Sequence, residues 1–215
     1  MTEWYPAFLN LKGRRCVVVG GGAVAERKLR ALVACGAAVT VIAPRCTGEI
    51  KAIAASGACR LVNRGYQAVD LEGAFLAIAA TDSAELNARV LANARESGAL
   101  TNAVDDPEGG DFIVPATIRR DDVILAISTG GKSPAYARHL RQQLEGWLTP
   151  ERISMLEVLA GVRRELQALG CNPDPETWRR AIACDDLGAL ADGDREEARA
   201  KLLEALDHAS VTSSG

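Results

Sequence analysis

The feature that most constrains the fold is a glycine turn between a short run of valines and a helical segment. A strand is predicted at about Arg15–Val19, because its three valines are β-branched and typical of a buried strand. A helix is predicted from Ala25 to about Cys35. Gly20, Gly22 and Ala25 fit the pattern G-x-G-x-x-(G/A). Strand, glycine turn and helix start are together typical of a dinucleotide-binding βαβ unit.

Each small residue of this turn has its own physical reason. Gly20 allows the tight turn, and Gly22 has no side chain that would keep a pyrophosphate from the backbone. Ala25 is small enough for the helix to lie close to the strand. The free N–H groups at the helix start then point at the phosphates. The alternative is a glycine turn in an α/β protein that binds no nucleotide.

The first half of the chain alternates between strand and helix. Further strands are predicted at residues 38–42, 59–63, 74–79 and 100–104, with helices at about 47–56 and 83–97, Ser83 being a candidate cap. This alternation predicts a doubly wound parallel sheet. Ligands of such sheets bind at the carboxyl ends of the strands, which places the following residues at the rim of a nucleotide crevice: Thr81, Asp82, Asn102 and Asp105.

The end of the second strand leaves the cofactor type open. An NAD site usually has an Asp or Glu at this position, where it binds the ribose hydroxyls. The chain instead has Ala43, Pro44 and Arg45. Arg45 is suited either to a 2′-phosphate or to the lining of an adenosine pocket, so this position does not choose between NAD and NADP.

The character of the chain changes after residue 104. An acidic, glycine-containing loop (105–111) precedes short extended pieces at 112–115 and 116–118, a turn at 119–122 and a strand at 123–128. A second small-residue loop (128–134) leads into a helix at 133–147. Further helices are predicted at 151–169, 175–183 and 194–208, with a frayed tail at 209–215.

Composition excludes several classes of protein. The net charge of −3 shows no bias towards nucleic acid, and no apolar run approaches the roughly 20 residues of a membrane span. The first six residues lack the features of a secretory signal, so we expect a cytoplasmic protein. None of the six cysteines forms a C-x-x-C pair, so we expect reduced thiols and no metal site.

Five ordered motifs resemble those of the siroheme synthase family, in its precorrin-2 dehydrogenase and sirohydrochlorin ferrochelatase module. They are Val18–Lys28, Ala79–Asp82, Asn102–Pro107, Phe112–Pro115 and Ser128–Pro134. The resemblance is strong from about Phe8 to Leu148 and looser beyond.

The resemblance implies a Rossmann-type NAD-binding domain (1–114), a dimerisation segment (115–149) and a helical domain (150–215) in a homodimer. It implies NAD-dependent oxidation of precorrin-2 to sirohydrochlorin and, in bifunctional members, insertion of Fe²⁺ to give siroheme. Some relatives carry a methyltransferase domain after this module. At 215 residues the chain resembles the stand-alone members.

Site residues follow from the same resemblance. Asp105 occupies the position of the family's key acid, a proposed general base, and a carboxylate at this rim suits removal of a proton. The expected cofactor contacts are Gly20, Gly22, Ala23, Val24, Pro44, Arg45, Thr81 and Asn102. The expected contacts to the tetrapyrrole substrate, a polycarboxylate suited to basic side chains, are Ser128, Thr129, Gly130, Lys132 and Arg138. Thr129 stands where some relatives carry a phosphoserine, which leaves phosphorylation open.

Two alternatives stay open. One is a dehydrogenase that does not insert iron. The other is a nucleotide-sensing regulatory module, a class that usually keeps the acid at the end of the second strand and lacks a second loop like 128–134. An iron-insertion assay distinguishes a dehydrogenase that does not insert iron from a bifunctional enzyme. Tight NAD binding without turnover indicates the nucleotide-sensing module.

Overall fold

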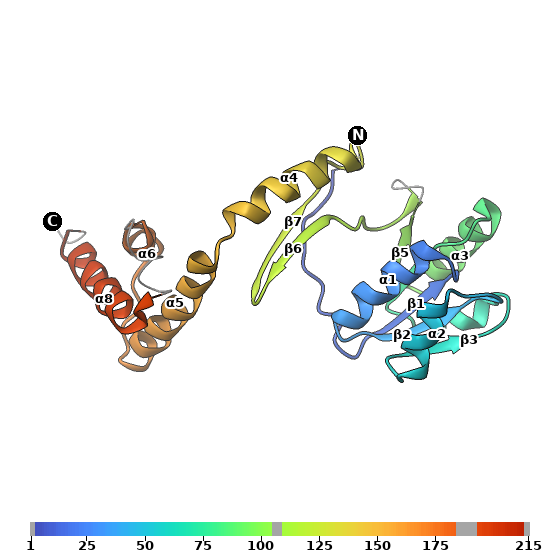
Figure 1. Ribbon diagram of the computed structural model, residues 1–215, viewed down its shortest axis with the longest axis horizontal. Coiled ribbons are helices and arrows are strands. Elements are labelled where there is room, and N and C mark those ends of the chain that lie inside the picture. The colour runs from blue at the N-terminus through green and yellow to red at the C-terminus, as the bar shows by residue number, and fades with distance from the viewer. Residues whose placement is uncertain (1–2, 105–108, 184–192, 213–215) are drawn as a thin grey trace. The chain divides into compact units, whose positions relative to one another are not determined.

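The computed structural model describes residues 3–104, 109–183 and 193–212 (Figure 1). The chain divides into two compact units. Residues 1–114 and 130–133 form the first, which we call the Rossmann unit, and residues 115–129 and 134–215 form the second, the C-terminal unit.

The Rossmann unit is built on five parallel strands, which confirms the predicted doubly wound fold. They are β1 (Arg15–Val19), β2 (Ala38–Ile42), β3 (Cys59–Val62), β4 (Leu76–Ala79) and β5 (Leu100–Ala103). Their order in the sheet is β3-β2-β1-β4-β5. The strand order therefore reverses between β1 and β4, and a crevice opens at such a point in doubly wound sheets. The strand β4 starts later than predicted, because Ala74 still lies in a turn, its N–H bonded to the carbonyl of Leu71.

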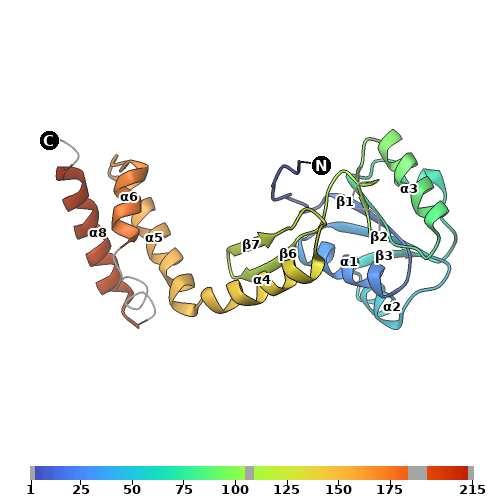
Figure 2. The same cartoon turned by 90° about the horizontal axis from the view of Figure 1, so that it is seen from above.

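Helices cover both faces of this sheet (Figure 2). The helices α1 (Ala23–Ala34) and α2 (Gly48–Ala55) pack on one face, and α3 (Ala84–Glu96) packs on the other. A short 3₁₀ helix, η1 (Ala68–Leu71), interrupts the connection between β3 and β4. Alternate residues of β1 serve the two cores: Val18 faces α1, whereas Val17 and Val19 face α3. All three are almost fully buried, as expected for a sheet covered on both faces.

Side-chain caps start two of these helices. The hydroxyl of Thr47 accepts the N–H of Ile50 at 3.2 Å, and that of Ser83 accepts the N–H of Leu86 at 3.2 Å. The predicted cap at Ser83 is thus confirmed. The helix α1 differs, because its first turn follows Gly22, which has no side chain to offer.

The C-terminal unit begins with an antiparallel hairpin of β6 (Ala116–Arg120) and β7 (Val123–Ile127), on which α4 (Pro134–Trp147) packs. The turn predicted at 119–122 is wrong in its first half, because Arg119 and Arg120 pair with β7. The turn itself is shorter and contains Asp121, with φ of 47°.

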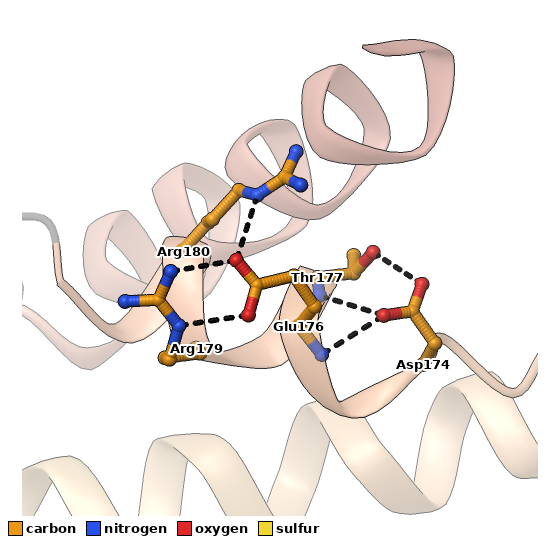
Figure 3. Close-up of polar contacts among 5 residues, drawn as sticks. All are labelled: Asp174, Glu176, Thr177, Arg179 and Arg180. Atoms are coloured by element: carbon orange, nitrogen blue, oxygen red, sulfur yellow. Dashed lines mark hydrogen bonds and ion pairs between the residues drawn. The ribbon is translucent and has the colours of Figure 1, made fainter. Parts of the chain in front are cut away.

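Among the described residues, the rest of this unit holds three helices with a common apolar core: α5 (Pro150–Ala168), α6 (Pro175–Ile182) and α8 (Arg195–Thr212). Asp174 caps α6 by accepting the N–H groups of Glu176 and Thr177 and the hydroxyl of Thr177 (Figure 3). The fraying predicted from 209 is wrong as far as 212, where α8 ends. In the ranges that the structure describes, no helix is long and apolar enough to span a membrane.

Candidate functional site

The carboxyl ends of the parallel strands meet at one edge of the sheet. Val19 pairs with Ile42 of β2 and with Ala79 of β4, and Ala79 pairs with Ala103 of β5. The loops that follow these strands therefore start side by side. The glycine turn, the segment around Pro44 and the turn at Thr81 all belong to this edge.

Gly20 is required by the fold itself. Its φ of +133° is one that side-chain-bearing residues rarely adopt. A Cβ at this position would lie 2.1 Å from the carbonyl oxygen of Ala80. The N–H of Gly20 also donates to the carbonyl of Ile42 at 3.0 Å. The prediction that Gly20 makes the tight turn is confirmed, and its contact with β4 adds a second reason.

Gly21 is equally constrained, although the glycine pattern treats it as a free position. A Cβ here would lie 2.0 Å from the carbonyl oxygen of Arg45. The carbonyl of Gly21 accepts the N–H of Thr47 at 3.0 Å. The turn is thus packed against the connection from β2 to α2. This contact involves a residue 24 positions away in the sequence, so no local pattern reveals it.

Gly22 is different, because neither conformation nor packing requires a glycine there. Its φ of −84° and ψ of −175° suit any residue, and a Cβ would meet nothing within 4 Å. The open space lies at the start of α1, where N–H groups and the helix dipole favour an anion. The turn therefore has the room and the donors that a dinucleotide pyrophosphate needs. Ala23 and Val24, the first residues of the helix, flank this space.

A small network shapes the turn after β4. The side chain of Asn87 accepts the N–H of Thr81 at 3.1 Å and its hydroxyl at 2.7 Å, and its amide donates to the carbonyl of Thr81 at 2.9 Å. Thr81 is therefore held by its backbone as well as its side chain. Sequence analysis selected Thr81 but missed Asn87, although the spacing of six residues from a strand end into the next helix is a readable signal.

Asn102 and Lys28 join β5 to α1. Asn102 is 4% exposed, and its Oδ1 accepts a hydrogen bond from Nζ of Lys28 at 3.2 Å. Its Nδ2 donates to the carbonyl of Phe112 at 2.9 Å. Burial lowers the pKa of Lys28 to about 8, with neighbouring Arg27 as a lesser cause. Lys28 lies within the first motif but was not predicted as a site residue.

The chain that follows residues 105–108 returns onto β5. A Cβ on Gly110 would lie 3.0 Å from the carbonyl oxygen of Thr101, and Thr101 also binds Asp111. The side chain of Asp111 is partly exposed, but it is tied to β5. Asp105, the carboxylate predicted to act as the general base, lies outside the described residues.

The remaining predicted site residues fall in both units. Pro44 and Arg45 are exposed at the end of β2. Gly130 and Lys132 belong to the Rossmann unit, where the nearest atom to a Cβ built on Gly130 is Cδ1 of Trp4, at 4.0 Å. The other three belong to the C-terminal unit and stay predictions as substrate contacts: Ser128, Thr129 and Arg138.

The thiols offer no metal centre within the described part of the chain. No group of three or more His, Cys, Asp or Glu side chains there is placed to hold an ion. The five cysteines described are unpaired. Burial raises the pKa of Cys16 to about 11, which disfavours the thiolate.

A parallel sheet in this strand order, with an open glycine turn at the start of α1, defines a dinucleotide-binding protein of the Rossmann class. Comparison with known proteins agrees with this class. A family model described as putative NAD(P)-binding matches residues 7–116, and one described as sirohaem biosynthesis protein, central, matches residues 125–146. The chain belongs to the siroheme synthase family.

Individual relatives support the same family. The chain is 42% identical over 214 residues to siroheme synthase of Methylococcus capsulatus, covering 97% of this chain and 44% of the relative. It is 38% identical over 200 residues to siroheme synthase 1 of Aeromonas salmonicida, covering 91% and 42%. The solved structure of SirC, precorrin-2 dehydrogenase, matches with a TM-score of 0.70 and 26% identity, covering 96% of this chain and 99% of that one. The chain thus spans less than half the length of the two siroheme synthases.

Proposed function

We propose that the protein oxidises precorrin-2 to sirohydrochlorin with NAD⁺. The observation that carries this proposal is the open space at Gly22, the one glycine of the turn that the fold does not require. The likeness to a precorrin-2 dehydrogenase over nearly the full length of both chains supports the choice of substrate.

The reaction removes a hydride and a proton from the substrate. When bound, NAD⁺ would supply the hydride acceptor. The glycine turn binds its pyrophosphate through the N–H groups at the start of α1. Ala23, Val24, Pro44 and Arg45 line its path, and Thr81 and Asn102 shape the rim. Asp105, two positions after the end of β5, is the proposed base for the proton.

The proposal includes a homodimer in the cytoplasm, with residues 1–114 binding NAD, 115–149 forming the dimer contact and 150–215 forming the helical domain. Support comes from α4, which leaves Tyr136 55% and Trp147 53% exposed. The hairpin beneath α4 is a two-stranded sheet, a form that is rarely stable alone. Light scattering coupled to size-exclusion chromatography measures the mass. A monomer at all concentrations would contradict this part.

The decisive experiment is anaerobic absorbance spectroscopy of the purified protein with precorrin-2. The sirohydrochlorin spectrum is expected only when NAD⁺ is present, together with equimolar NADH. Fe²⁺ is then added as a second substrate: a protein-dependent change to the siroheme spectrum indicates iron insertion, and its absence indicates a dehydrogenase alone. Tight NAD⁺ binding without turnover would overturn the proposal in favour of a nucleotide-sensing module.

A further inference from the structure

Lys28 and Asn102 form a polar contact next to an apolar row of the sheet. In the sheet, Asn102 pairs with Ile78, which in turn pairs with Val18, so a buried amide ends an apolar row. A half-buried ammonium group of α1 binds this amide. Two apolar side chains would pack here without the cost of removing polar groups from water. Departures of this kind are typical of functional positions.

Lys28 determines which way the amide faces. An ammonium group can only donate hydrogen bonds, and the carbonyl oxygen of Phe112 can only accept them. The side chain of Asn102 lies between the two, with Oδ1 towards Lys28 and Nδ2 towards Phe112. The lysine therefore fixes one orientation of the amide, and the amide in that orientation joins β5 to the returning segment.

The ammonium group of Lys28 has a neutral partner in this arrangement. In the described ranges, no ion pair within 4.0 Å includes Lys28. Its contact is the amide oxygen of Asn102, 74 positions away in the sequence. A partly buried cation whose contact among the described residues is a neutral amide is costly to the fold, so this contact alone does not account for a lysine here.

We propose that Lys28 is a positioning residue of the dehydrogenase: acting through Asn102, it holds β5 and the segment at Phe112 in the arrangement that substrate oxidation requires. This inference rests on the proposed function. Lys28 takes neither the hydride nor the proton. Its contribution is the placement of the chain at the β5 side of the crevice, where displacements of about 1 Å suffice to impair a reaction.

The test compares three lysine variants by steady-state kinetics with precorrin-2 and NAD⁺. Lys28→Met is expected to lower kcat about tenfold or more, while KM for NAD⁺ changes less than about twofold. Lys28→Arg keeps the charge and the donors and is expected to recover most of the activity. Lys51→Met, at an exposed position on α2 of the same unit, is the matched control and keeps wild-type kinetics.

A double-mutant cycle with Asn102→Leu separates positioning from a direct role. If Lys28 acts through Asn102, adding Lys28→Met to Asn102→Leu lowers kcat less than about twofold further. Multiplicative losses would overturn the inference. Far-UV circular dichroism checks that each variant is folded, and Lys28→Gln replaces Lys28→Met if the latter fails this check.

Different results would contradict the proposed function and the positioning role of Lys28. If the wild type does not oxidise precorrin-2, the proposed function is wrong and this inference falls with it. If the wild type is active and Lys28→Met matches Lys51→Met, only the positioning role is wrong.

Discussion

The carboxylate of Asp111 accepts two hydrogen bonds from Thr101, one from its N–H at 2.9 Å and one from its hydroxyl at 2.6 Å. The N–H of Asp111 donates in return to the carbonyl of Thr101 at 2.8 Å. Thr101, including its hydroxyl, is fully buried. Asp111 therefore ties its own segment to β5, and its loss leaves the buried hydroxyl of Thr101 without this acceptor.

We expect Asp111→Ala to lower the free energy of unfolding by about 1–3 kcal/mol, because the hydroxyl and N–H of Thr101 lose their acceptor. Asp111→Asn keeps one acceptor oxygen and should lose less. Urea unfolding at pH 7 measures both. Asp82→Ala, an exposed carboxylate at the same edge of the sheet, is the control. Equal losses for Asp82→Ala and Asp111→Ala would contradict the assignment.

Substitutions of the three glycines in the turn should affect two different properties, the stability of the fold and the binding of NADH. Gly20→Ala and Gly21→Ala are expected to destabilise the fold, since each Cβ would lie within 2.1 Å of a backbone oxygen. Gly22→Val should leave the free energy of unfolding unchanged to within about 1 kcal/mol and weaken NADH binding at least about tenfold. Thermal unfolding and fluorescence titration with NADH measure the two properties. Undiminished binding by a folded Gly22→Val protein would contradict the proposed pyrophosphate site.

Asp70 should make stability depend on acid pH. The guanidinium of Arg64 binds its carboxylate at 2.6 and 2.8 Å and holds the pKa of Asp70 below its usual 3.8, against the opposing effect of burial. A carboxyl with a lowered folded pKa stabilises the protein above its unfolded pKa and loses this effect as pH falls through the folded pKa.

We expect Asp70→Asn to be less stable than wild type by about 2 kcal/mol at pH 7. The difference should shrink below pH 3.8. Chemical unfolding from pH 7 to pH 2.5 follows it. A difference that does not vary with pH would exclude the carboxylate charge as its cause.

Lys28 should make stability depend on alkaline pH. Its pKa is lowered from 10.5 to about 8 in the folded protein, so between these values the unfolded chain binds more protons. Stability then rises with pH across this window. We expect the free energy of unfolding of the wild type, relative to Lys28→Met, to increase from pH 8 to pH 10. Parallel curves for the two proteins would show that Lys28 titrates normally.

Local patterns were sufficient to predict most of the Rossmann unit. The strand at Arg15–Val19 ends in three β-branched valines followed by glycine, and Ser83 precedes its helix in the manner of a cap. Both signals lie within a few residues of the structure that they predict. The hairpin turn was misplaced because Arg119 and Arg120 are charged, and charge alone does not distinguish an exposed strand from a turn.

Two of the residues missed at the site, Gly21 and Lys28, depend on distant partners. Gly21 is constrained by the backbone of Arg45, and Lys28 by an amide on β5. Neither constraint has a period or a spacing that a pattern can detect, because the partners meet only after the sheet has formed. The predicted substrate contacts in the second small-residue loop (128–134) stay predictions.

The different roles of the three glycines in the turn have a consequence for evolution. A descendant that no longer used a dinucleotide would still be under selection to keep Gly20 and Gly21, since both avoid backbone collisions. Only Gly22 would be free to drift. An intact pair of leading glycines therefore records the ancestry of a domain, whereas the third glycine records whether the ligand is still in use.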